Sequence, residues 1–253
     1  MSAKASRRRS PKEIFWCKRA EHYDKLYWVR DKSYLDAIIE RGDFRKGQVV
    51  LDVGVGTGTV AKKIKPHVKH VIGLDISDSM LSRSNWEGIS LVKWDVCQRL
   101  FDKNVFDRIV ARMVFHHILD DLDGALKRCF DMLKPGGKII IAEGLPPSDD
   151  PGVVKWYEGM FALKEERRTF TERELYERVA KAGFRNIAVC RHIMHGFSVR
   201  NWLANSGLPK EAQHKIMDMH MNAGDDVKGA YGMRIVGGDC LINTRNVIVI
   251  GEK

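Results

Sequence analysis

The amino-acid sequence predicts an α/β protein built on a doubly wound, mostly parallel sheet of seven strands. Two observations lead to this prediction: short apolar runs alternate with helix-forming segments along most of the chain, and the first run ends in a glycine-rich turn. Apolar runs of this length are typical of strands buried on both faces, and their alternation with helices is typical of parallel sheets. The 253 residues fit one domain of this kind with added helices.

The N-terminal segment is predicted to form helices ahead of the first strand. Ser10-Pro11-Lys12-Glu13 combines an N-cap serine with proline at the first helical position, so a helix is expected to start there and to run through Tyr23 and Tyr27. A second helix is expected at 33–41, where it ends at a glycine. For the basic residues 1–10 we expect a solvated, disordered tail, and contact with nucleic acid is the alternative.

The first strand, residues 49–53, leads into glycines at positions 54, 56 and 58, and a helix is expected to start directly after them. Glycines let the backbone turn tightly and bring its N–H groups against a ligand, although an ordinary tight turn is the alternative. This spacing differs from the G-x-G-x-x-G that binds dinucleotides, which disfavours a nicotinamide dehydrogenase. Asp52 lies two positions ahead of the first glycine, and its charge favours an ammonium or sulfonium group over a pyrophosphate.

Acidic residues also end the next two predicted strands. Strand 70–75 ends at Asp75, whose carboxylate can accept hydrogen bonds from both ribose hydroxyls of an adenosine. Strand 89–94 is followed by Asp95, which can accept the exocyclic amine of an adenine. Because ligands of parallel sheets bind outside the carboxyl ends of the strands, these acids are expected at one common site.

The C-terminal half continues the alternation of strands and helices. Thr171 begins a capping box, which predicts a helix start at that residue. The last strand, 246–250, is expected to return antiparallel beside the strand before it. The other elements are expected as strands at 106–111, 138–143 and 187–194, and as helices at 78–84, 120–133, 153–163 and 171–183.

An insertion at 196–240 precedes the last strand and is rich in aromatic residues and methionines. Because flexible thioethers adapt to irregular apolar shapes, the insertion and helix 153–163 are expected to build a substrate pocket. The run 217–221 has methionines and a histidine suited to copper, but these residues point in different directions on a helix, so no metal site is predicted. The predicted substrate contacts are Tyr157, Trp202, Tyr231 and Arg234.

Five motifs occur in an order and spacing that resemble the class I S-adenosylmethionine-dependent methyltransferases. They are LDVGVGTG at 51–58, GLDIS at 73–77, WDV at 94–96, FDRIV at 106–110 and LKPGG at 133–137. The resemblance covers residues 45–195 and is closest to the small-molecule branch (methyltransferase type 11) that includes enzymes of ubiquinone and menaquinone biosynthesis. It implies a Rossmann-like fold, S-adenosylmethionine as cofactor and residues 11–44 as lid helices over the cofactor. The implied cofactor-binding residues are Tyr23, Asp52, Gly54, Gly56, Asp75, Ile76, Asp95, Val96 and Arg112.

The fourth strand leads into the side chains that such an enzyme places beside the transferable methyl group. Arg112 is expected either to bind the methionyl carboxylate of the cofactor or to pair with Asp52. His116 and His117 are the candidate catalytic residues, because imidazole titrates near neutral pH and can accept a proton from a hydroxyl or an amine. A structural role in orienting this loop is the alternative, and we favour it for the pair.

Composition narrows the class of protein. Five cysteines are scattered without a C-x-x-C, which argues against a disulfide framework and a structural zinc site and favours a reducing cytoplasm. No apolar run approaches the ~20 residues of a membrane span, so a soluble protein is expected. The net charge of +10 raises the question of a polyanionic partner, but beyond the tail the positive residues mix with acids.

These observations predict an enzyme that transfers a methyl group from S-adenosylmethionine to a small-molecule acceptor, either an anionic or a quinone-like metabolite. A small closed pocket with arginines would indicate an acidic metabolite, and a long apolar tunnel a prenylated quinone. An RNA methyltransferase and a non-catalytic cofactor-binding protein are the alternatives, and the oligomeric state, monomer or homodimer, stays open. The expected parts are a tail (1–10) and one domain (11–253) with lid (11–44), core (45–195), insertion (196–240) and last strand (241–253).

Overall fold

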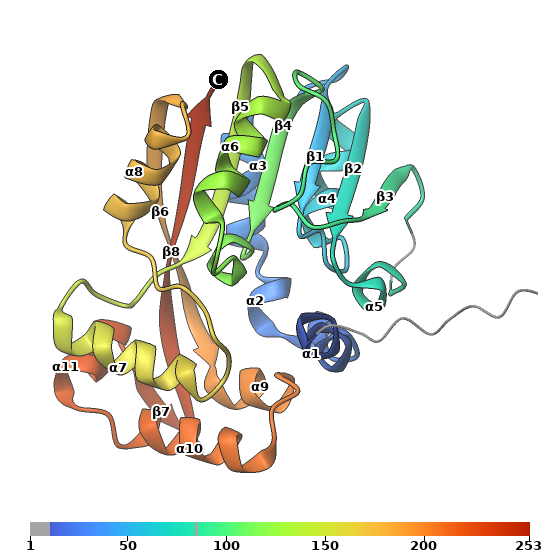
Figure 1. Ribbon diagram of the computed structural model, residues 1–253. Helices are drawn as coiled ribbons and strands as arrows, with labels where there is room; N and C mark the ends of the chain where they lie inside the picture. The colour runs from blue at the N-terminus through green and yellow to red at the C-terminus, as the bar shows by residue number, and fades with distance from the viewer. Residues whose placement is uncertain (1–10, 84–85) are drawn as a thin grey trace, which may run out of the picture.

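The computed structural model describes residues 11–83 and 86–253, so the predicted N-cap at Ser10 and the basic tail lie outside the described residues. The described strands form one sheet in the order β3-β2-β1-β4-β5-β8-β6, with β7 paired to β8 (Figure 1). Strands β1 to β5 are parallel to one another, and β8 lies antiparallel between β5 and β6. The strands are β1 Val49–Val53, β2 His70–Asp75, β3 Ile89–Lys93, β4 Phe106–Arg112, β5 Leu133–Gly144, β6 Arg185–Ser198, β7 Arg234–Val236 and β8 Asp239–Glu252.

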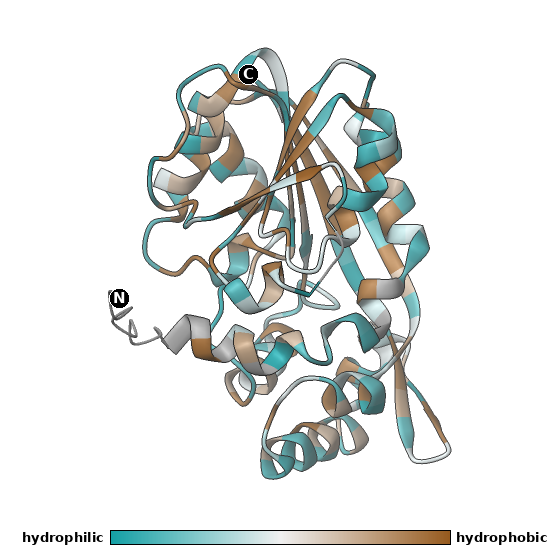
Figure 2. Cartoon of the chain, turned by 90° about the vertical axis from the view of Figure 1, so that its right-hand side faces the viewer, coloured by the Kyte–Doolittle hydropathy of each residue, from teal (hydrophilic) through white to brown (hydrophobic). Residues whose placement is uncertain are grey.

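Helices cover both faces of the sheet, as a doubly wound fold requires (Figure 1). Residues alternate along β1: Leu51 and Val53 pack toward α6 (Leu122–Met132) and α8 (Glu172–Lys181), while Val50 packs toward α3 (Lys32–Gly42) and α4 (Thr59–Ile64). Figure 2 shows the hydrophobic residues gathered on the strands between these helices. The predicted fold class, including the antiparallel last strand, is confirmed.

The glycine turn after β1 has the backbone conformation that only glycine adopts readily. Gly54, Gly56 and Gly58 have φ angles of 66°, 55° and 86°. At Gly54 a Cβ atom would also lie 2.4 Å from Cγ2 of Val114, so the loop after β4 closes directly over the turn. A side chain is therefore excluded at Gly54 both by conformation and by space.

The N-terminal helix is shorter than predicted. Helix α1 covers Pro11–Ala20, a 3-10 turn follows at Tyr23–Lys25, and α2 (Tyr27–Arg30) is a separate single turn. The predicted continuous helix through Tyr27 was wrong because the segment bends down to the glycine turn, where the Thr57 hydroxyl donates to Asp24 Oδ1 at 2.6 Å. Helix α1 consequently lies across the carboxyl edge of the sheet, beside α5 (Asp78–Leu81) (Figure 1).

The insertion is not purely helical, because two strands of the sheet extend into it. Strands β6 and β8 are each 14 residues long, and their pairing continues to Ser198 and Leu241. The hairpin of β7 and β8 turns at Gly237 and Gly238, which both have positive φ angles. We call the layer around these strand ends the helical cap; it consists of α7 (Pro151–Ala162), α9 (Val199–Ala204), α10 (Lys210–Met221), α11 (Asp225–Tyr231) and β7.

The helical cap has a hydrophobic core of its own, which includes Val153, Trp202 and Ile216. Leu26 and Val29 from the N-terminal segment join this core, so the lid and the cap pack together. Among the described residues, none of the helices combines the length and the apolar character needed to cross a membrane.

Candidate active site

A cavity of about 330 Å³ lies at the carboxyl ends of β1, β2 and β4, where the sequence predicts the cofactor site. Asp75 is held in place at its edge: Oδ2 accepts the Gly56 N–H and Oδ1 accepts the Ser77 N–H, both at 2.9 Å. Burial raises the pKa of Asp75, and these backbone hydrogen bonds act in the opposite direction. Eight of the nine predicted cofactor residues line this cavity: Tyr23, Gly54, Gly56, Asp75, Ile76, Asp95, Val96 and Arg112.

The ninth, Asp52, is buried just behind the cavity. Burial raises its pKa to about 8, although an Ala61 N–H hydrogen bond lowers it. Its Oδ2 atom has no hydrogen-bond partner among the described residues. A buried, unpaired carboxylate oxygen beside a glycine turn fits a cationic ligand group, because a positive charge would compensate the cost of burial.

Arg112 contacts the lid instead of Asp52. Its Nη2 atom donates to the Trp28 carbonyl at 2.5 Å, and its guanidinium lies over the rings of Trp28 and Tyr34 at 5.2 and 5.4 Å. Arg112 and Asp52, which are both described, form no ion pair. Burial lowers the pKa of Arg112. Arg112 thus joins the end of β4 to the N-terminal segment at the wall of the cavity.

A second cavity, of about 130 Å³, adjoins the first and extends under the helical cap. Three of the four predicted substrate residues, Tyr157, Trp202 and Tyr231, line this second cavity. Arg234 does not, because it lies exposed on β7. Six side chains line both cavities and so form their common wall: Trp16, Tyr23, Met113, His117, Lys164 and Glu165.

The two candidate catalytic histidines differ in their surroundings. His116 is buried, and its Nδ1 atom lies 2.6 Å from Oε2 of Glu143, whose Oε1 accepts the N–H groups of Val114 and Phe115. Burial lowers the pKa of His116 well below its ordinary value and raises the pKa of Glu143 to about 7. This arrangement favours the structural role for His116, because Glu143 holds both the ring and the loop that carries it.

His117 instead reaches the wall that the two cavities share. Its ring meets the Trp16 ring edge-on with centroids 4.9 Å apart. Burial, and next the neighbouring His116, lowers the pKa of His117 well below its ordinary value, so the imidazole is neutral at pH 7. The Tyr23 hydroxyl shares this wall and stays protonated, because burial raises its pKa to about 12.

A buried group of charges in the second cavity was not predicted from the sequence. Glu165 pairs with Arg19 of α1 at 2.7 Å, with Lys164 at 2.5 Å and with Arg167 at 3.8 Å. All four side chains are at most 8% exposed. Burial raises the pKa of Glu165, but Lys164 and Arg19 outweigh this effect and hold it well below its ordinary value. Burial lowers the pKa of Lys164 to about 7, so this amine is only partly protonated at neutral pH. The two arginines and the partly charged lysine still carry more positive charge than Glu165 neutralises.

His116, His117 and Glu165 also offer ligand atoms that lie within 4.8 Å of one another. Glu165, however, already pairs with two arginines and a lysine, and one ring nitrogen of His116 is bonded to Glu143. Because a metal cation would be repelled by Arg19 and Arg167, the surroundings favour an anion over a metal ion.

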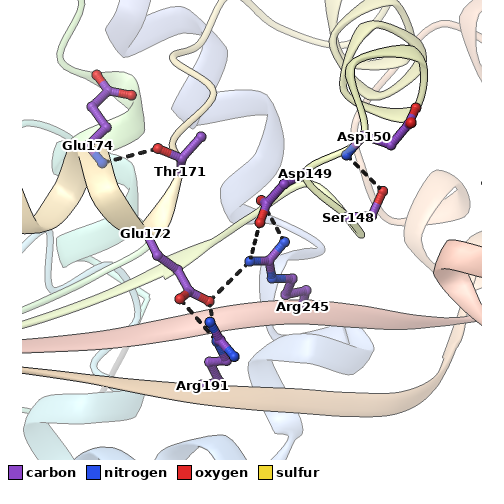
Figure 3. A network of polar contacts seen from close by, with 8 residues as sticks. All are labelled: Ser148, Asp149, Asp150, Thr171, Glu172, Glu174, Arg191 and Arg245. Atoms are coloured by element: carbon purple, nitrogen blue, oxygen red, sulfur yellow. Dashed lines mark hydrogen bonds and ion pairs between the residues drawn. The ribbon is translucent and has the colours of Figure 1, made fainter.

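A further network of ion pairs surrounds Arg245, which lines the second cavity (Figure 3). Arg245 of β8 donates to Asp149 at 2.8 Å and to Glu172 at 3.1 Å. Glu172 also accepts from Arg191 of β6 at 2.7 Å. These contacts join the loop before α7, the start of α8 and the two long strands.

The fold and the two cavities define a class I methyltransferase domain with its cofactor site at the carboxyl edge of a parallel sheet. Residues 26–189 match the family model described as a methyltransferase domain. The chain therefore belongs to the S-adenosylmethionine-dependent methyltransferases, with S-adenosylmethionine as the cofactor.

Comparisons with individual proteins agree with this family. Phosphoethanolamine N-methyltransferase 2 of Caenorhabditis elegans is 39% identical over 113 residues, which are 41% of this chain and 26% of that protein. The chain thus spans about a quarter of that relative. The crystal structure of YcgJ from Bacillus subtilis is similar with a TM-score of 0.77 at 19% identity, covering 88% of this chain and 99% of that one.

A third similarity is to phosphoethanolamine N-methyltransferase 2 of Haemonchus contortus, solved with phosphomonomethylethanolamine and S-adenosylhomocysteine. It has a TM-score of 0.61 at 21% identity and covers 92% of this chain and 57% of that one. At this identity the likeness supports the fold only.

Proposed function

We propose that this protein transfers a methyl group from S-adenosylmethionine to a small acceptor molecule that carries an anionic group. The observation that carries the proposal is the pair of buried arginines, Arg19 and Arg167, which share one carboxylate in a small cavity that adjoins the cofactor cavity. Lys164, whose pKa burial lowers to about 7, adds a partial positive charge beside them. Buried cations of this kind favour a ligand that brings its own negative charge.

The size of the second cavity supports an acidic metabolite over a prenylated quinone. A volume of about 130 Å³ suits a small molecule, and the cavity is lined by arginines as well as aromatic rings. A long prenyl chain requires an extended apolar tunnel instead. Of the two acceptor classes expected from the sequence, the anionic one is therefore the one we propose.

The residues on the common wall are proposed to position the reaction. When bound, S-adenosylmethionine supplies an electrophilic methyl group on a positively charged sulfur. Trp16, Tyr23 and Met113 then exclude water and hold the acceptor in line with that methyl group. His117 is proposed to accept the proton that a hydroxyl or amine nucleophile loses, and Glu143 is proposed to keep the loop in position through His116.

The cofactor-binding residues are proposed to act in two ways. Asp75 holds the ribose hydroxyls, since its two oxygens are oriented by the N–H groups of Gly56 and Ser77. Asp52 is proposed to receive the ammonium group of the cofactor, because its unpaired Oδ2 atom lies under the glycine turn. The part of the predicted lid before α3 is proposed to cover the cofactor, because Trp16 and Tyr23 line the cofactor cavity, whereas α3 covers a face of the sheet. The helical cap is proposed to provide the acceptor site.

Phosphoethanolamine is the first acceptor to test, because it is a small phosphate ester with an amine and is named in the Caenorhabditis elegans relative. Transfer of radioactive methyl from S-adenosylmethionine is measured to phosphoethanolamine and to uncharged ethanolamine, and then to other paired acids and neutral analogues. We expect transfer to the anionic member of a pair. Arg167→Met is expected to lower kcat/KM for that acceptor roughly 10- to 100-fold, the loss of one charge-assisted hydrogen bond.

The matched control is Arg173→Met, which removes an arginine whose side chain is 87% exposed. Affinity for S-adenosylhomocysteine should be unchanged in both variants, which shows that the sheet and the cofactor site remain intact. Equal transfer to the neutral members, or no difference between the Arg167 and Arg173 variants, would contradict an anionic acceptor.

A further inference from the structure

His220 presents a hydrogen-bond acceptor that the protein itself leaves unused. It lies on α10 and is completely buried. Its Nδ1 atom lies 2.7 Å from the Ile216 carbonyl oxygen. Because a carbonyl oxygen only accepts hydrogen bonds, Nδ1 carries the proton and Nε2 carries the lone pair. Among the described residues no group bonds to Nε2.

The ring of His220 is part of the second cavity, where we propose that the acceptor molecule binds. It lines this cavity together with Trp202 and Tyr231, whose rings lie 6.4 and 6.3 Å away. Trp156 packs edge-on against it at 5.1 Å. Since Nδ1 faces the backbone of its own helix, Nε2 is on the opposite side of the ring and points away from α10. A buried hydrogen-bond acceptor atom without a partner costs free energy, so we expect a bound molecule to donate a hydrogen bond to Nε2.

The imidazole of His220 is neutral. Burial lowers its pKa, and the hydrogen bond to Ile216 raises it less. A neutral imidazole with Nδ1 protonated accepts one hydrogen bond at Nε2 and does not attract an anion. Its role therefore differs from that of Arg167 and Lys164 in the same cavity.

We propose that Nε2 of His220 accepts a hydrogen bond from a hydroxyl or N–H group of the acceptor molecule and thereby selects acceptors that carry such a donor. This inference rests on the proposed function and extends it. The Arg167 guanidinium lies 4.3 Å from the centroid of the Phe161 ring. Phe161 in turn contacts Trp202, and Trp202 lies beside His220. The acceptor is thus a bifunctional molecule, with an anion near Arg167 and a donor toward His220, separated by aromatic walls.

Selectivity of this kind is large when a buried group is left unpaired by the wrong ligand. A site built to accept a hydrogen bond discriminates against an analogue without the donor far better than an apolar pocket distinguishes sizes. The side chain at 220 is therefore expected to act on acceptor choice and not on cofactor affinity.

The test compares two probes of nearly equal shape, 4-hydroxybenzoate and 4-fluorobenzoate, of which only the first donates a hydrogen bond. Their binding to the full chain with S-adenosylhomocysteine is measured by calorimetry. We expect the hydroxyl compound to bind at least tenfold more tightly, because 4-fluorobenzoate leaves the buried Nε2 atom unpaired. In His220→Phe that preference should vanish, while 4-fluorobenzoate binds within about twofold of its wild-type affinity.

Two further variants keep the test decisive. His220→Gln retains a hydrogen-bond acceptor and should keep part of the preference even if the phenylalanine variant folds poorly. His214→Phe alters an exposed histidine on the same helix and should keep all of it. The inference is overturned if wild-type protein does not bind 4-hydroxybenzoate or does not distinguish the probes, or if His220→Phe still distinguishes them, as it would if Nε2 served only a bound water.

Failure of the inference and failure of the proposed function give different results. If Arg167→Met weakens both acids equally but neither wild type nor variant prefers the hydroxyl, the anionic site stands and the role of His220 is wrong. If the hydroxyl preference depends on His220 but Arg167→Met has no effect, the anionic acceptor is wrong and the donor recognition stands.

Discussion

Asp52 is a single side chain whose position is unfavourable in the free protein and useful with a ligand. It is 2% exposed, and its Oδ2 atom has no partner among the described residues. Because its pKa of about 8 in the folded protein lies above the ordinary value of 3.8, folding favours the protonated form. The penalty for ionising Asp52 therefore grows as pH rises from about 4 to about 8.

Asp52→Asn should remove this penalty. The free energy of unfolding of the variant, minus that of wild type, is expected to increase by roughly 2–4 kcal/mol as pH rises from 5 to 8.5. Urea unfolding of the free protein at both pH values measures the gain, and S-adenosylhomocysteine should bind the variant more weakly. The exposed Asp102, changed to asparagine, should show no pH-dependent gain. A constant difference between Asp52→Asn and wild type would contradict this account.

At the scale of residues, the lining of the cofactor cavity and the aromatic lining of the second cavity were largely predictable, but the charged lining of the second cavity was not. Asp75 and Asp95 follow apolar runs, and parallel topology alone brings them together. Arg19, Lys164 and Arg167 occur in charged stretches that look like solvated surface. They are buried only because α1 packs against the loop after α7, a tertiary contact that no local pattern encodes. The role of His220 depends in the same way on packing within the helical cap.

At the scale of elements, a buried ion pair between α1 and the loop after α7 adds to the apolar contacts that join the N-terminal segment to the cap. Arg19 of α1 and Glu165 of the loop after α7 are joined at 2.7 Å, and their side chains are 6% and 4% exposed. Arg83 and Glu21 form an exposed pair at 3.6 Å close to the same helix. Breaking the buried pair is expected to cost more free energy of unfolding than breaking the exposed pair, because exposed ion pairs contribute little to stability.

Arg19→Gln should destabilise the protein by roughly 2–3 kcal/mol, since Glu165 loses one of its buried cations. Amide hydrogen exchange in residues 14–30 should accelerate, because α1 is less firmly held. Arg83→Gln serves as the control and should leave both quantities nearly unchanged. Equal exchange in the two variants would show that the buried pair does not hold the lid.

The central strands were predicted correctly because they are apolar on both faces. The predicted strand at 70–75 matches β2 residue for residue, and the Thr171 side chain caps α8 by accepting the Glu174 N–H. Strand β7 was missed because three exposed residues are too few to show a periodic pattern. The break after α1 was missed because it depends on Asp24 reaching Thr57 across 33 positions of sequence.

At the scale of the whole molecule, the network around Arg245 joins the sheet to the helices that cover it. Glu172 accepts from Arg191 and Arg245, and its side chain is 17% exposed (Figure 3). Hydrogen bonding to Arg191 lowers the pKa of Glu172. The stabilisation is therefore present above the ordinary pKa of glutamate and is lost as pH falls through the lowered value.

Glu172→Gln should lower the free energy of unfolding by about 1–2 kcal/mol at pH 7 and by less at pH 3.5. It should also raise the KM for the acceptor, because Glu172 holds Arg245, and Arg245 lines the second cavity, where we propose that the acceptor binds. Glu177→Gln removes a glutamate whose exposed side chain pairs with Arg173 on the surface of the same helix, and it should change neither quantity. Similar losses in both variants would refute the role given to the network.

Strands β6 and β8 bear on how molecules enter and leave the enzyme. Both run from the sheet into the cap, and their pairing shifts register near Arg185 and again near Gly196, so the cap is built on the same strands as the sheet. Trp16 of α1 lines the cofactor cavity, and Arg19 joins this helix to the loop after α7, so we expect α1 to move when ligands enter. Cofactor and acceptor would then share one entrance to the two cavities. S-adenosylhomocysteine could leave only after this entrance has opened, so the movement would limit the rate of turnover.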